Sequence, residues 1–218
     1  MIRLTKGAKP QLLTDNAAQW TRELLASIHR DDGTYGELIK EYNKPAIKDA
    51  LEAETHGKCM YCEGRIKALG YNHIEHIKPK DRTRFPELTF EWENLGVACN
   101  VCNLNKGEEF DVALPYINPY IEDPADHFVA SGAFVFHSPN DARGKLTEIK
   151  IQLNRKALLE TRGDVLLALQ RLVSDYHAEQ HPAMKETLRD QIWRECGRDK
   201  QFSFVLKAFA EFAGVPAN

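Results

Sequence analysis

Cys59-Met60-Tyr61-Cys62 and Cys99-Asn100-Val101-Cys102 are two Cys-x-x-Cys pairs separated by 36 residues. A turn of this kind points two thiolates at one position, and two such turns complete a tetrahedral Cys₄ zinc site. The alternatives are four buried thiols or a redox pair, but two pairs arise by chance far less often than one. We expect a structural zinc, because four cysteine ligands leave no position open for substrate. This zinc would pin the two ends of the segment between Cys62 and Cys99.

The segment between the pairs, and the residues just after it, carry the candidate catalytic chemistry. The relevant runs are Asn72-His73-Ile74-Glu75-His76-Ile77-Lys78-Pro79-Lys80, Glu93-Asn94-Leu95 and Asn103-Leu104-Asn105-Lys106-Gly107. Glu75 beside His76 offers an oxygen ligand for a hard metal ion next to a general base. Asn94 and Asn103 add neutral amides that can orient a base or complete a metal shell.

The order of these motifs resembles that of the HNH endonuclease family. Cys-x-x-Cys, Glu-His-Ile-x-Pro, Asn-Leu and Cys-x-x-Cys-Asn-x-x-Lys-Gly follow one another between residues 58 and 108. The resemblance implies a ββα-metal core, in which a hairpin and a helix hold one divalent ion against the scissile phosphate. We therefore expect an α+β fold with a small zinc-stabilised ββα-metal core over 58–110, a helical flank at 1–57 and a mixed, mainly helical region at 111–218.

The same resemblance implies a role for each matching residue. Glu75 and Asn103 match metal ligands, and His76 matches the general base that activates water. Asn94 matches the central asparagine, which holds the base and positions the second strand. At Asn103 the sequence departs from the literal motif, which has histidine there. An amide at this position favours a hard ion such as Mg²⁺ or Mn²⁺ over softer metals.

Strand geometry leaves a second candidate for the base. In a regular strand Glu75 and His76 would point to opposite faces, so both serve one site only if the strand ends or bends there. Pro79 favours such an end, because proline resists the interior of a β-ladder. His73 shares the parity of Glu75 and is the alternative base or ligand. Its other interpretation is a packed or capping histidine.

The charge distribution locates a candidate phosphate footprint. The whole chain carries 29 basic and 32 acidic residues, a net charge of -3, so it is no polycation. Residues 65–84 hold six basic and two acidic residues, which fits phosphate contacts or a solvated charged loop. Residues 108–126 hold six acidic residues and no Lys or Arg, and offer a docking surface. The candidate nucleic-acid contacts are Lys78, Lys80, Arg82 and Lys106.

Periodicity predicts the elements of the two flanks. We expect a helix from an N-cap at Thr14-Asp15-Asn16 to about residue 30, and a second helix from Pro45 to Gly57. Short strands are expected at 134–136 and 146–153, and a long helix after an Asn154 cap. Two more helices are expected at 182–195 and 199–213.

Neither a membrane segment nor a signal peptide is expected from the sequence. The longest apolar run, 165–169, is far too short to cross a bilayer, and residues 1–6 lack an apolar signal-peptide core. We expect a soluble cytoplasmic protein with no membrane partner. Cysteines paired as Cys-x-x-Cys in a reducing compartment are typical of metal binding.

A wider resemblance links the chain to the PtuB-type HNH proteins of Septu and retron-associated anti-phage defence systems. It is carried by Met1-Ile2-Arg3-Leu4-Thr5-Lys6-Gly7 with Pro10, and by Ile149-Lys150-Ile151-Gln152-Leu153-Asn154 with Leu158 and Arg162 following. It implies a metal-dependent endonuclease that cleaves nucleic acid, with DNA favoured, beside an ABC-type ATPase (PtuA). In a retron setting, a reverse transcriptase and its RNA–DNA product would hold the complex in check.

A second class of function is a catalytically inert, zinc-stabilised module that binds nucleic acid or a partner protein. In this interpretation the HNH core is a scaffold and the flanking helices shield it. The joint presence of Glu75, His76, Asn94 and Asn103 favours the enzyme, because an inert copy has no need of all four.

Overall fold

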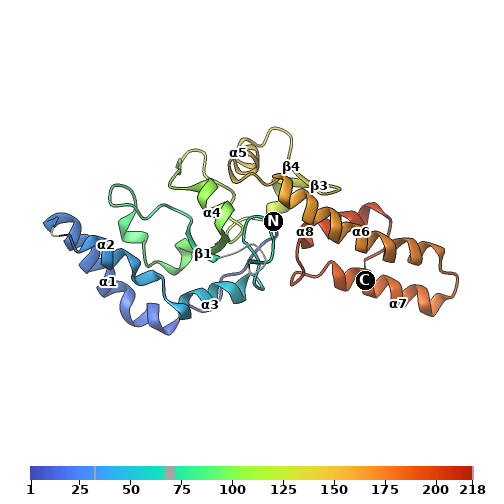
Figure 1. Ribbon diagram of the computed structural model, residues 1–218, viewed down its shortest axis with the longest axis horizontal. Helices are drawn as coiled ribbons and strands as arrows, with labels where there is room; N and C mark the ends of the chain where they lie inside the picture. Colours follow the sequence, from blue (N-terminus) through green and yellow to red (C-terminus); the bar gives the residue numbers. More distant parts are fainter. Residues whose placement is uncertain (32, 67–71, 218) are drawn as a thin grey trace.

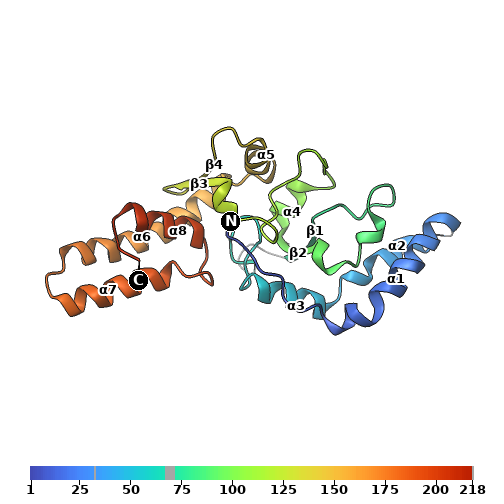
Figure 2. The same ribbon diagram turned by 180° about the vertical axis from the view of Figure 1, so that it is seen from behind.

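The computed structural model describes residues 1–31, 33–66 and 72–217. The described part is elongated, with α1–α3 at one end, α6–α8 at the other and the β1–β2 hairpin between them (Figures 1 and 2). The α-helices are α1 (Gln11–Arg30), α2 (Tyr35–Leu38), α3 (Pro45–Glu54), α4 (Asn100–Lys106), α5 (Ala142–Ile151), α6 (Lys156–Ala178), α7 (Pro182–Glu195) and α8 (Ser203–Phe212). The strands are β1 (Asn72–His76), β2 (Leu95–Cys99), β3 (Phe128–Ser131) and β4 (Phe134–His137). Short 3-10 helices span Ile39–Tyr42, Pro86–Leu88, Trp92–Asn94 and Pro124–Asp126.

The central unit is a ββα motif. β1 pairs antiparallel with β2, and α4 follows β2 without a loop. Glu75 lies opposite Gly96 in the register. A Cβ atom at Gly96 would lie 2.5 Å from the Met60 Sδ atom, so glycine lets the first cysteine turn sit against the sheet. The predicted α+β fold with this small core is confirmed.

The N-terminal flank packs onto the same unit. The α1 helix begins at Gln11, about four residues before the predicted cap, because the Thr14 hydroxyl donates back to the Pro10 carbonyl as a helical residue does. The α3 helix begins at Pro45, as expected, and buries Ile47 and Leu51 completely.

The C-terminal region contains one element that differs in type from the prediction. The strand at 134–136 is confirmed as part of β4, but the strand expected at 146–153 is wrong, because residues 142–151 form α5. The Asp141 carboxylate accepts a hydrogen bond from Gly144 N at 2.8 Å and caps this helix.

The cap predicted for the long helix is also wrong. The Asn154 carboxamide binds both Val135 backbone groups, which joins the β3–β4 hairpin to the start of α6, and Arg155 takes the N-cap position. The α6, α7 and α8 helices pack on one another close to the expected ranges. Across the ranges that the structure describes, no helix combines the length and apolarity needed to traverse a bilayer.

Candidate active site

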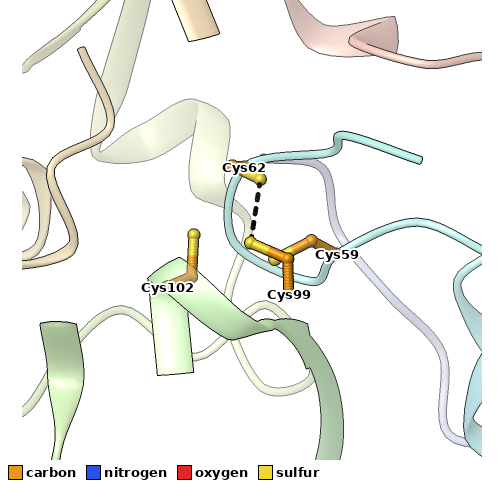
Figure 3. A group of neighbouring side chains, drawn as sticks. All are labelled: Cys59, Cys62, Cys99 and Cys102. Atoms are coloured by element: carbon orange, nitrogen blue, oxygen red, sulfur yellow. Dashed lines mark hydrogen bonds between the residues drawn. The ribbon is translucent and has the colours of Figure 1, made fainter. Parts of the chain in front are cut away.

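The four paired cysteines converge on one point (Figure 3). All four are buried and free of disulfides, and their Sγ atoms lie within 4.8 Å of one another. The Cys62 and Cys99 sulfurs are 3.9 Å apart. Tetrahedral zinc with Zn–S bonds of about 2.3 Å separates its sulfurs by about 3.8 Å. The cluster therefore has the donor set and the spacing that a structural zinc requires.

Arg155 covers this cluster from the C-terminal region. Its guanidinium nitrogens lie 3.5 Å from the Cys102 sulfur, 3.7 Å from that of Cys99 and 3.8 Å from that of Cys62. Burial alone would lower the pKa of Arg155, but the neighbouring thiols outweigh burial and raise it. Zinc with four thiolates has a net charge of about -2, and an arginine here offsets part of it. No motif in the sequence marks this contact.

A separate cleft of about 450 Å³ gathers the predicted base His76 and the predicted metal ligands Glu75 and Asn103. Both Glu75 and His76 line it, although they are adjacent in sequence. This is possible because β1 ends at His76 and the chain turns toward Pro79, as the position of the proline predicts. The polar and charged side chains that line the cleft are Tyr42, Asn43, Lys48, His73, Glu75, His76, Lys80, Asn103, Lys106 and Glu108.

His76 is held by one hydrogen bond and one ring contact. Its Nε2 atom lies 3.0 Å from the Thr89 carbonyl oxygen, and its ring meets the Tyr42 ring edge-on at 4.6 Å between centroids. A carbonyl only accepts, so Nε2 carries the hydrogen and Nδ1 keeps the lone pair. Burial, reinforced by Lys80 and Lys106, lowers the pKa of His76 to about 3. The neutral ring that results is the form that accepts a proton.

Glu75 is a buried carboxylate with two close partners. Its Oε1 atom lies 2.7 Å from Lys106 Nζ and accepts a hydrogen bond from the Tyr61 hydroxyl at 3.2 Å. Burial raises the pKa of Glu75, and the Lys106 cation opposes this. Lys106 also donates to the His76 carbonyl oxygen at 2.9 Å and is itself buried. The Lys106 ammonium group thus has two protein partners at the cleft, and its contact with nucleic acid stays a prediction.

Asn103 and Glu75 are the predicted metal ligands, and both line the cleft with side-chain oxygen donors. Asn103 is half-buried, and its carboxamide makes no hydrogen bond to any residue that the structure describes. A carboxylate and an amide oxygen suit a hard divalent ion that keeps several waters. The residues present therefore fit Mg²⁺ or Mn²⁺.

Asn94 lies outside the cleft and organises its edge. Its Oδ1 atom accepts from Lys78 N at 2.8 Å, and its Nδ2 group donates to the Lys78 and Leu88 carbonyls at 3.0 and 3.1 Å. These bonds tie the exit of β1 to the turn that ends beside Thr89, the residue that holds His76. Asn94 is accordingly a positioning residue.

The other predicted positions are spread along the rim. Lys80 lines the cleft with Nζ 5.0 Å from the Tyr42 ring, and Lys78 is exposed near Phe85. Arg82 pairs with Asp31 at 3.4 Å on the surface. His73 lines the same cleft as His76, so it stays the alternative base or ligand. Lys67, counted in the basic stretch, lies outside the described residues.

Sequence reasoning missed five residues of the site, one of which, Glu108, it counted only in the acidic stretch at 108–126. Tyr42, Asn43 and Lys48 come from the N-terminal flank and line the cleft, and Tyr61 binds Glu75 from within the first cysteine turn. None belongs to a spacing pattern, and only Tyr61 had a signal, its position between two metal ligands.

Comparisons with known proteins agree with this geometry. The HNH endonuclease family model matches residues 59–109. A Septu protein PtuB from Bacillus thuringiensis is 32% identical over 156 residues, which take in 71% of this chain and 55% of the relative. A Septu protein PtuB from Bacillus mycoides (strain KBAB4) is 26% identical over 199 aligned residues, covering 76% of this chain and 67% of the relative. The chain thus spans little more than half the length of the first relative.

Proposed function

We propose that the protein hydrolyses phosphodiester bonds of nucleic acid with one divalent metal ion, which the match of residues 59–109 to the HNH endonuclease family and the similarity to PtuB proteins support. The observation that carries the proposal is the meeting of Glu75, His76 and Asn103 in a single cleft. A general base and two oxygen donors side by side match what phosphodiester hydrolysis needs.

The residues of the cleft divide the chemistry between them. His76 accepts the proton of the attacking water at Nδ1, while the Thr89 carbonyl holds its Nε2–H and fixes the tautomer. Glu75 and Asn103 would hold Mg²⁺ or Mn²⁺, which when bound polarises the phosphate and stabilises the leaving oxygen. Asn94 keeps the strand exit and the Thr89 turn in register. Lys78, Lys80 and Arg82 add positive charge along the path of the nucleic acid.

The cysteine cluster takes no part in the reaction. We propose that it binds one structural zinc through Cys59, Cys62, Cys99 and Cys102, which leaves no ligand position for substrate. The zinc holds the first cysteine turn against α4, and so sets the frame in which β1 presents Glu75 and His76.

The biological role is inferred from the two relatives. Both are named Septu protein PtuB. We propose that this chain is the effector nuclease of a cytoplasmic anti-phage defence complex, acting on DNA beside an ABC-type ATPase of the PtuA kind. In a retron setting, a reverse transcriptase and its RNA–DNA product would be further partners of the complex. The second candidate, an inert zinc-stabilised binding module, is kept as the outcome that the experiment must exclude.

The test is a cleavage assay on the protein purified with whatever ATPase accompanies it. Labelled plasmid DNA and labelled RNA are incubated with Mg²⁺, with Mn²⁺ or with a chelator, using wild type and His76→Ala. The proposal expects products only with wild type and a divalent ion. Absence of cleavage under every condition, with zinc bound and the partner present, would support the binding module.

A further inference from the structure

Part of the wall of the catalytic cleft lies outside the HNH domain. Tyr42 and Asn43 come from the end of the 3-10 helix Ile39–Tyr42, and Lys48 from the first turns of α3. Figures 1 and 2 show α3 and α4 on opposite sides of β1, so the cleft is bounded by the N-terminal flank as well as by the ββα core.

The position of Lys48 relative to the catalytic residues is fixed by packing. Its neighbours Ile47 and Leu51 are completely buried, and α3 packs against β2, the partner strand of β1. The Tyr42 ring contacts the His76 ring directly. This segment of the flank is therefore a rigid part of the site.

Lys48 differs from the other lysines of the segment in its partners. Lys40 pairs with Glu37, and Lys44 pairs with Glu41, both at 2.9 Å. Within the described ranges, Lys48 has no ion pair or hydrogen bond, and the Asn43 side chain has no hydrogen bond. A half-buried lysine that lines a polar cleft and makes no hydrogen bond or ion pair there has its donors available for an anion.

The charge balance of the cleft identifies that anion. The cleft is lined by three lysines (Lys48, Lys80 and Lys106) and two carboxylates (Glu75 and Glu108), and Lys106 pairs with Glu75, so the lining keeps a net positive charge. A strand of nucleic acid brings one phosphate after another into a groove of this kind. An amide beside an ammonium group is a common pair of donors for phosphate oxygens.

We propose that Lys48 and Asn43 form a phosphate-binding subsite that holds a backbone phosphate next to the scissile one. This inference rests on the proposed nuclease function and deepens it. It makes the N-terminal flank a substrate-binding element, and the HNH domain alone an incomplete site.

The experiment measures binding by the full chain in a His76→Ala background, so that the nucleic acid stays intact. A fluorescein-labelled DNA duplex and a labelled RNA strand of the same sequence are titrated over a range of salt concentrations. Lys48→Ala should weaken binding of the preferred probe about fivefold, the effect of one phosphate contact, independently of sequence. The slope of log affinity against log salt should fall by about 0.9 for duplex DNA or about 0.7 for a single strand. Lys48→Arg should keep the wild-type slope.

Lys44→Ala is the matched control, since it removes the same charge four residues earlier from a lysine already paired with Glu41. Equal affinity and slope for Lys48→Ala and its parent would overturn the subsite, as would an equal loss in Lys44→Ala. If the parent protein bound neither probe, the proposed function itself would fail. Thermal melting and zinc content, unchanged in all variants, show that the comparison is made between folded proteins.

Discussion

The cysteine cluster and the catalytic cleft are built on opposite plans. The cluster takes four identical ligands from two short turns and buries all of them, so it is closed once a metal binds. The cleft takes different side chains from the N-terminal flank, β1, the segment after it and α4, and it stays open. Residue spacing alone can specify the first kind of site, whereas the second depends on how distant segments pack.

The largest expected effect tests whether the cluster is structural. Cys102→Ser should prevent stable folding of the core, because zinc in small domains contributes on the order of 10 kcal/mol, comparable with the whole stability of a domain. Cys196→Ser is the control, since that cysteine is buried away from the cluster. The measurement is zinc content together with thermal melting. If the Cys102→Ser protein melted like wild type, the cysteine cluster would not be a structural site, and this difference between the cluster and the cleft would be wrong.

The next largest effect is expected at the buried ion pair between Glu75 and Lys106. Glu75→Gln leaves Lys106 buried without its counter-charge, and should cost about 3 kcal/mol in the free energy of unfolding. Adding Lys106→Met should recover part of that loss, since no buried charge remains. Cleavage by Glu75→Gln should be slower and should respond to extra Mg²⁺. Denaturant titration and a metal titration of the rate check both parts, and wild-type behaviour in both would contradict the role of Glu75.

A substitution of the general base should lower activity without affecting the cysteine cluster. His76→Ala is expected to slow cleavage at least ~10²-fold, about 2.7 kcal/mol in the barrier, with zinc content unchanged. His73→Ala, on the same strand and in the same cleft, is the matched comparison and should lose less. If the order of the two rates were reversed, His73 would be the base.

The smallest effect is a pH dependence of stability. The pKa of His76 is about 3 in the folded protein against an ordinary value of 6.5, so the unfolded chain binds more protons between these values. The contribution of the neutral His76 ring to the free energy of unfolding is complete above pH 6.5. It falls as the pH drops below that value, by up to about 1.4 kcal/mol per pH unit. Wild type should therefore lose about 2 kcal/mol more than His76→Asn between pH 6.5 and 5 in denaturant titrations. A difference between the two proteins that did not change with pH would contradict the burial of a neutral ring.

The sequence predicted the part of the molecule that short motifs encode. The two cysteine pairs and the Glu75-His76 dipeptide indicated the ββα core and the residues that meet in the cleft. Tyr42 and Lys48 gave no such signal, because their place beside His76 depends on how α3 packs against β2. For Lys106 the sequence predicts a contact with nucleic acid, and only the structure shows this lysine buried against Glu75.

The misassigned element has a similar cause. The sequence predicts a short strand over residues 146–153, which the structure shows as the second half of α5 and the turn after it. The buried positions Gly144, Thr147 and Ile151 instead follow the spacing of a helix, and the Asp141 cap settles the local competition in favour of α5. Two of these buried positions, Gly144 and Thr147, are not large apolar residues. The spacing of apolar residues alone therefore does not indicate the helix.

Arg155 also has a consequence for the order of events during synthesis. It lies 53 residues beyond Cys102, so all four cysteines leave the ribosome well before the residue that covers their sulfurs. Domains fold as they emerge, N-terminal parts first, and the metal-binding turns can close before α6–α8 exist. The guanidinium of Arg155 then completes a cluster whose four sulfur ligands are already assembled.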